Sequence, residues 1–139
     1  MKGKFFLDTN ILLYSFAIDQ DEKKIKAKNL IATALDSNLG IISFQVIQEF
    51  LNVMSKGKEA LMKEKDRELY LEKTLFPLFQ IYPSKELYLK TIEIQERWKY
   101  SFYDSLIISA ALFGNCSTLY SEDLQHDQKI FGLTIKNPF

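Results

Sequence analysis

The 139-residue sequence has few of the features that mark small secreted proteins or membrane proteins. Its single cysteine, Cys116, rules out a disulfide within the chain, and we expect it to be a small buried hydrophobic residue. Its longest mainly apolar stretch, residues 106–113, is far shorter than the roughly 20 residues that span a bilayer. A chain of this length buries roughly 68–70% of its unfolded surface, so it folds without disulfides or a structural metal. One globular domain over residues 1–139 is expected.

The sequence also lacks a net charge and a cluster of metal-binding histidines, and its N-terminus is not expected to be a signal peptide. Eighteen basic and 18 acidic residues cancel, which counts mildly against nucleic-acid binding because such proteins are usually basic. The total hides the distribution, since acids gathered around bound cations would leave the remaining surface positive. Asp8 and Asn10 interrupt the apolar N-terminal run and no clear cleavage site follows, so we expect a cytoplasmic protein. His126, the only histidine, is expected on the surface or in packing.

Short apolar runs alternate with helical patterns along the whole chain. The pattern predicts strands at 5–7, 40–44, 80–83, 117–120 and 133–135. Helices are predicted directly after the first strand and at 19–39, 45–55, 57–79, 84–98 and 101–113. This alternation favours an α/β fold in three layers, with a mainly parallel five-stranded sheet between helices.

Residues 4–14 organise the rest of the chain. They read KFFLDTNILLY, a short buried strand that stops at Asp8, followed by turn residues and the start of a helix. A simple interpretation is that Asp8 or Asn10 only caps this helix. However, the carboxyl edge of a parallel sheet is also where ligands bind in open α/β folds. The remaining acids decide between these interpretations.

Four carboxylates fall at the same predicted edge of the sheet. Asp8 and Asp123 close strands, Asp104 opens a buried helix, and Glu49 lies one turn into a helix that follows a strand. Each also has a simpler interpretation: Glu49 as a solvated surface residue, and Asp104 as part of a capping box with Ser101. Their common placement favours a shared site.

A cluster of carboxylates repels itself unless a cation is bound, and the repulsion raises pKa values. Mg²⁺ takes oxygen ligands and is commonly held by a few carboxylates together with substrate phosphate. The absence of a histidine or cysteine cluster argues against zinc. The acids therefore indicate a metal-dependent nuclease, in which the ion activates water against a phosphodiester.

The chain resembles PIN-domain ribonucleases, and among them the VapC-type toxins of bacterial and archaeal toxin–antitoxin pairs. The matching stretches are FLDTNILLY around Asp8, VIQEF around Glu49, YDSLIISAA around Asp104, and LYSEDL together with the terminal NPF. Four stretches in the family's order, over residues 4–139, make this a specific resemblance.

The resemblance implies an endoribonuclease that uses Mg²⁺ or Mn²⁺ bound by Asp8, Glu49, Asp104 and Asp123. It also implies that Asn10 and Ser121 orient ligands or water. A homodimer and a small antitoxin that covers the cleft are implied as partners, and we expect residues 57–79 to contact the antitoxin. Two departures stand out: Ser121 replaces a frequent threonine and keeps its hydroxyl, and Asp127 replaces a frequent glycine.

The acids near the end of the chain need separate assignments. Strand side chains alternate in direction, so Ser121 and Asp123 are expected to face the site and Glu122 to be solvated on the other side. Asp127 could share a helical face with Asp123 and is expected at most as an outer, water-mediated ligand.

Other functions remain open at this level. A haloacid-dehalogenase-like phosphatase needs a second acid at position 10, where this chain has Asn10. A receiver-like signalling module needs paired acids after the first strand, and only Asp8 is present there. A housekeeping PIN nuclease of RNA processing, or a silent PIN-like module that binds RNA or a partner, fits the same motifs.

Overall fold

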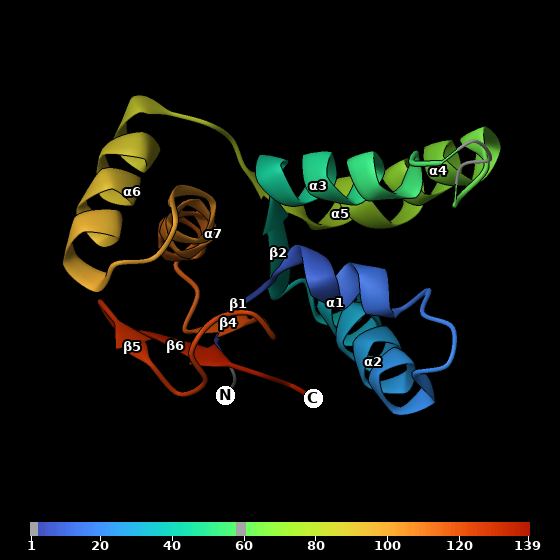
Figure 1. Cartoon of the computed structure of the whole chain (residues 1–139), viewed down its shortest axis with the longest axis horizontal. Coiled ribbons are helices and arrows are strands. Elements are labelled where there is room, and N and C mark those ends of the chain that lie inside the picture. The colour runs from blue at the N-terminus through green and yellow to red at the C-terminus, as the bar shows by residue number, and fades with distance from the viewer. Residues whose placement is uncertain (1–2, 58–60) are drawn as a thin grey trace.

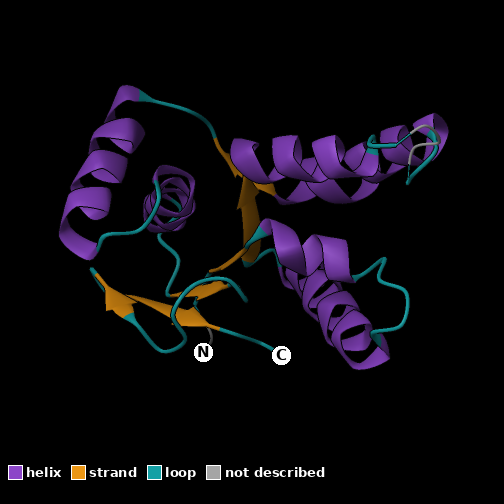
Figure 2. Cartoon of the chain, in the orientation of Figure 1, coloured by secondary structure: helices purple, strands orange, loops and turns teal. Residues whose placement is uncertain are grey.

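A six-stranded sheet runs through the centre of the molecule (Figure 2). The computed structural model describes residues 3–57 and 61–139. The strands are β1 (Phe5–Leu7), β2 (Gly40–Ser43), β3 (Phe79–Ile81), β4 (Thr118–Tyr120), β5 (Lys129–Ile130) and β6 (Leu133–Lys136), in the spatial order β3-β2-β1-β4-β6-β5. Every neighbouring pair is parallel except β5 and β6. The predicted α/β fold with a mainly parallel sheet is confirmed.

Helices cover both faces of this sheet (Figure 1). The chain order is α1 (Thr9–Tyr14), α2 (Asp21–Ser37), α3 (Phe44–Met54), α4 (Glu64–Tyr70), a π-helical turn η1 (Leu71–Leu75), α5 (Phe76–Leu78), α6 (Lys85–Trp98) and α7 (Phe102–Phe113). In Figure 1, α6 and α7 lie on one side of the strands, and α1, α2 and α3 lie on the other. The sheet therefore forms the middle of three layers.

The connections explain why the helices divide in this way. From β1 the chain moves outward through β2 to β3, and it then returns across the sheet to β4 on the other side of β1. Because parallel crossovers are right-handed, this reversal sends α6 and α7 to the opposite face. The strand order thus reverses between β1 and β4, and open α/β sheets bind ligands in the crevice at such a point.

The core extends over both faces of the central strands, against α7 on one side and α1, α2 and α3 on the other. Phe6 and Leu7 of β1 and Leu119 of β4 are fully buried, as is most of α7. The sequence predicted a buried helix over 101–113, and the structure confirms its burial and its end at Phe113. Cys116 is also buried, as predicted. None of the helices in residues 3–57 and 61–139 is long and apolar enough to cross a membrane.

Two sequence predictions of local structure were wrong. Strand β5 was missed because two residues carry no periodic pattern, and this strand exists only through its antiparallel pairing with β6 across the Phe131–Gly132 turn. The helix predicted over 57–79 begins only at Glu64, while residues 58–60 lie outside the described part of the chain. Several large apolar residues along the chain are more than half exposed, among them Ile25, Leu61, Leu69, Phe76, Leu89 and Ile92.

Candidate functional site

Asp8 lies at the carboxyl end of β1, between the sheet and α1. It is almost fully buried, and its Oδ1 accepts a 2.7 Å hydrogen bond from the backbone N–H of Thr9, which caps α1. Its Oδ2 accepts a 2.7 Å hydrogen bond from the hydroxyl of Ser121, just beyond the neighbouring strand β4. Asp8 is therefore the predicted helix cap and also faces the strand-order reversal, so the two interpretations do not exclude each other.

The surroundings of Asp8 disfavour its negative charge. Burial raises the pKa of Asp8 from 3.8 to about 6, against the hydrogen bonds from Ser121 and Thr9, which lower it. The charges of Glu49 and Asp123 raise this pKa further. A buried carboxylate that is repelled by its neighbours is a frequent mark of a functional site.

The four predicted acids line one cavity of about 310 Å³. Asp8 reaches it from β1, Glu49 from α3, Asp104 from the first turn of α7, and Asp123 from the loop after β4. Asn10 lines the same cavity. The structure thus brings together side chains that are up to 115 positions apart in the sequence, from Asp8 to Asp123, at the edge where the sequence placed them.

Glu49 is held by two neutral hydrogen-bond donors that the sequence motifs alone do not reveal. The Thr9 hydroxyl donates a short 2.5 Å hydrogen bond to Oε1, and Nε2 of Gln45 donates a 3.1 Å bond to Oε2. Gln45 precedes Glu49 by one helical turn, so the two side chains lie on the same face of α3. That spacing was visible in the sequence, whereas the contact with Thr9 depends on how α1 packs on α3.

Asp104 lies in the first turn of α7, where Ser101 caps the helix. The Ser101 hydroxyl accepts a 3.1 Å hydrogen bond from the backbone N–H of Asp104, which confirms the predicted N-cap. Partial burial raises the pKa of Asp104; a side-chain hydrogen bond between its carboxyl and Ser101 opposes this effect, and the charges of Asp123 and Glu49 add to the increase. The backbone N–H of Asp104 serves the cap, while its carboxylate lines the cavity.

The loop after β4 follows the predicted alternation. Ser121 faces Asp8, and Asp123 lines the cavity while its Oδ2 accepts a 3.0 Å hydrogen bond from the Asn10 amide. Glu122 points elsewhere, but the prediction that it is merely solvated was wrong. Its carboxylate pairs with Lys23 at 2.5 Å and accepts a 2.5 Å hydrogen bond from the hydroxyl of Tyr14, and Lys23 and Tyr14 lower its pKa.

Asp127 is not among the residues that line the cavity. Its carboxylate pairs with Lys136 and lies 3.3 Å from Nε2 of His126, and its backbone adopts a left-handed conformation. The short helix that was expected to align Asp127 with Asp123 does not form, because the chain turns toward β5 instead. No contact of Asp127 in the described residues therefore supports its expected role as an outer metal ligand.

The donor atoms of the cavity fit a hard divalent cation. All four charged groups are carboxylates, and none of them takes part in an ion pair with a basic side chain in the described residues. The amide oxygens of Asn10 and Gln45 are also buried without a hydrogen-bond partner in that part of the chain. Within residues 3–57 and 61–139, no three His, Cys, Asp or Glu side chains converge on one point. Mg²⁺ needs only one or two direct carboxylates, since it keeps several of its waters.

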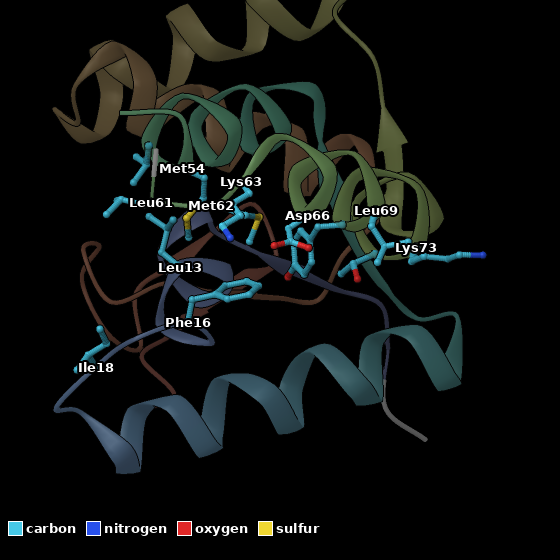
Figure 3. Close-up of a pocket in the computed structure, with 13 residues that line it drawn as sticks. Leu13, Phe16, Ile18, Met54, Leu61, Met62, Lys63, Asp66, Leu69 and Lys73 are labelled. Carbon is cyan, nitrogen blue, oxygen red and sulfur yellow. The ribbon is translucent and has the colours of Figure 1, made fainter. Parts of the chain in front are cut away.

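An apolar groove of about 900 Å³ adjoins the acid cavity. Leu13 and Val53 line both hollows, so the two share a wall. Figure 3 shows Leu13 and Phe16 on one side of the groove and Met62, Asp66, Leu69 and Lys73 on the other. Phe16 and Leu69 are 41% and 55% exposed, so large apolar side chains face an open hollow beside the acids.

Comparisons with known proteins agree with this geometry. The chain has the same fold as a toxin–antitoxin complex component from Klebsiella pneumoniae, with 19% sequence identity, a TM-score of 0.68 and 98% of each chain covered. It also matches VapBC2 from Rickettsia felis, solved bound to a DNA fragment of its promoter, with 22% identity, a TM-score of 0.68, and 96% of this chain and 97% of that chain covered.

A third similar structure is VapC20 from Mycobacterium tuberculosis, described as a toxin that cleaves the sarcin–ricin loop. It shares 15% identity with a TM-score of 0.63, over 86% of this chain and 90% of that chain. At these identities the likeness shows a shared fold, and no curated protein sequence matches the chain. The PIN-domain family model matches residues 5–131, which include all four acids, and the chain therefore belongs to the PIN-domain family.

Proposed function

We propose that this protein is a metal-dependent endoribonuclease that acts in the cytoplasm as the toxin of a type II toxin–antitoxin pair. The observation that carries the proposal is the cavity lined by Asp8, Glu49, Asp104 and Asp123 at the strand-order reversal. Membership of the PIN-domain family and the fold shared with the toxins named above support it.

Mg²⁺ or Mn²⁺ is the proposed cofactor, bound in the cavity that these four acids line, by some of them directly and by the others through water. When bound, such an ion supplies an activated water and stabilises negative charge on a phosphodiester. The chain's own groups prepare the site for it. Ser121 and Thr9 hold the carboxylate of Asp8 by hydrogen bonds, Asn10 holds Asp123, and Thr9 and Gln45 hold Glu49. Because these donors are neutral, they orient the acids without cancelling their charge.

The apolar groove is the proposed contact surface for an antitoxin. Much of it comes from Leu61 and the residues after it, within the 57–79 region where the sequence predicted partner contact. The shared wall at Leu13 and Val53 lets a segment in the groove reach the mouth of the acid cavity.

The resemblance also implies a homodimer, and we include it in the proposed function. Sedimentation of the purified protein tests this oligomeric state.

A cleavage assay on single-stranded RNA tests the proposed activity. The wild-type protein should cut RNA with Mn²⁺ or Mg²⁺ and stop on addition of EDTA. Asp123→Asn should lower the rate by at least about a hundredfold, because a metal ligand and a charge are lost. Glu122→Gln is the matched control, since it changes the adjacent acid outside the cavity and should keep the rate.

The same assay separates the alternatives. RNA binding without any cleavage, under all metal conditions, would favour a silent RNA-binding module. A covalent phosphoenzyme would instead indicate phosphatase chemistry. Normal growth of cells that overexpress active, antitoxin-free protein would contradict the toxin role and favour a housekeeping nuclease.

A further inference from the structure

Gln45 links the helices that carry Glu49 and Asp104, two of the candidate acids. It is the second residue of α3 and is only 3% exposed. Its Nε2 donates to Oε2 of Glu49 at 3.1 Å and to the backbone carbonyl of Tyr103 at 3.2 Å. Tyr103 directly precedes Asp104, so one amide group joins the helix that carries Glu49 to the helix that carries Asp104.

The chemistry of the contacts settles which way the amide faces. The Glu49 carboxylate and the Tyr103 carbonyl can only accept hydrogen bonds, and an amide nitrogen has two protons to give. Rotating the amide by half a turn would place its oxygen against two other oxygens. Both protons of Nε2 are therefore used, one on each helix.

Burying the Gln45 amide costs stability, so packing alone does not explain why a glutamine stands at this position. Oε1 of Gln45 is buried without a hydrogen-bond partner in the described part of the chain. An unsatisfied buried acceptor lowers stability, and an apolar side chain of similar size would avoid it. A lysine or arginine at this position would satisfy Glu49 but would also neutralise it and compete with a cation. Glutamine is the side chain that donates twice and leaves the charge of Glu49 available.

We propose that Gln45 is a positioning residue that sets the spacing between Glu49 and Asp104 for divalent-cation binding. The proposal rests on the metal-dependent function proposed above. Groups that orient metal ligands from behind commonly contribute tenfold to hundredfold to metal affinity. Gln45 itself does not need to touch the cation or the RNA.

Calorimetric titration of the purified protein with Mn²⁺ tests this role without relying on activity. Gln45→Met keeps the length of the side chain and removes both donors, and it should weaken Mn²⁺ binding by about tenfold or more. Gln48→Met makes the same change on an exposed position of α3 and should bind as wild type does. Mn²⁺ should also raise the melting temperature less in Gln45→Met, since ligand stabilisation depends on affinity.

A double-mutant cycle distinguishes positioning from a general structural role. In a Glu49→Gln background, Gln45→Met should weaken Mn²⁺ binding much less than it does in wild type, because the acid that it holds is already neutral. Equal losses in both backgrounds would overturn the proposal. Gln45→Asn, whose amide is one methylene too short to reach both acceptors, should reproduce the loss and serves if Gln45→Met does not fold.

The outcomes also separate this inference from the proposed function. Wild-type protein that binds no Mn²⁺ would overturn both. Wild-type binding that Asp8→Asn abolishes, together with unchanged binding in Gln45→Met and Gln45→Asn, would overturn the role of Gln45 and leave the proposed function standing. A lower melting temperature with unchanged Mn²⁺ affinity would likewise show that Gln45 serves the fold alone.

Discussion

The hydroxyl of Ser121 donates a 2.7 Å hydrogen bond to the carboxylate of Asp8, and both residues are buried. This bond crosses from the end of β4 to the end of β1, the two strands between which the strand order reverses. It also favours the charged form of Asp8, because a donor to a carboxylate lowers its pKa.

Ser121→Ala should therefore raise the pKa of Asp8 further and weaken Mn²⁺ binding near neutral pH. Ser121→Thr keeps the hydroxyl, and it should retain binding far better than Ser121→Ala. Calorimetry at pH 6 and pH 8 checks both, and the loss in Ser121→Ala should be larger at pH 6, where more of Asp8 is protonated. Equal affinity of the alanine variant and wild type at both pH values would contradict this account.

The raised pKa of Asp8 also predicts how the stability of the metal-free protein varies with pH. The folded state holds this proton up to a pH of about 6, whereas an exposed aspartate in the unfolded chain releases it near 3.8. Between these values the folded state binds more protons, so this residue's contribution to stability falls as pH rises and stays low above about 6. The difference corresponds to roughly 2–3 kcal/mol, since each pKa unit is worth about 1.4 kcal/mol.

Asp8→Asn removes this cost, so it should raise the melting temperature of the EDTA-treated protein at pH 7.5 by several degrees. At pH 4 the two proteins should differ much less, because Asp8 is then largely protonated in the folded state. Thermal unfolding followed by circular dichroism over pH 4–8 provides the comparison. A destabilised Asp8→Asn at pH 7.5 would show that the helix cap outweighs the buried charge.

Asp104 and Ser101 allow the capping and site roles to be measured separately. The cap uses the backbone N–H of Asp104, which survives in Asp104→Asn. This variant should therefore fold with little change in melting temperature and lose RNA cleavage. Ser101→Ala should do the opposite, lowering the free energy of unfolding by about 1 kcal/mol, as expected for a lost N-cap. Unfolding of Asp104→Asn would favour the capping box as the main role of this acid.

The sequence predicted most of what positions the site, because that information is local. A strand that ends at Asp8, a helix that opens at Asp104 and an alternating loop through Asp123 each follow from a few neighbouring residues. Parallel strands then bring their carboxyl ends to one edge whatever their order. The strand order itself was not predicted, and neither was β5, which is formed by pairing across a turn.

The contacts that hold the acids could not be read from the sequence. Thr9 reaches Glu49 only because α1 packs on α3, and Glu122 is paired only because Tyr14 of α1 and Lys23 of α2 approach it. Leu69 lies within the helix predicted over 57–79, yet it is 55% exposed. An apolar stripe indicates that a helix face is covered, but it does not say whether the same chain covers it.

Exposed leucines on two different helices allow the apolar groove to be tested as a partner surface. Leu69 on α4 lines the groove and is 55% exposed, while Leu89 on α6 is 56% exposed and is not among the residues that line it. Leu69→Lys should prevent a co-expressed antitoxin from binding, because a charge would be placed against its apolar side chains. Leu89→Lys makes the same change at an equally exposed leucine and should leave binding intact. Co-purification from cells that express both genes measures the difference.

Both variants should keep the cleavage rate of wild type in the absence of antitoxin, since neither residue lines the acid cavity. Retention of the antitoxin by Leu69→Lys, at the level seen for Leu89→Lys, would show that the partner covers another face.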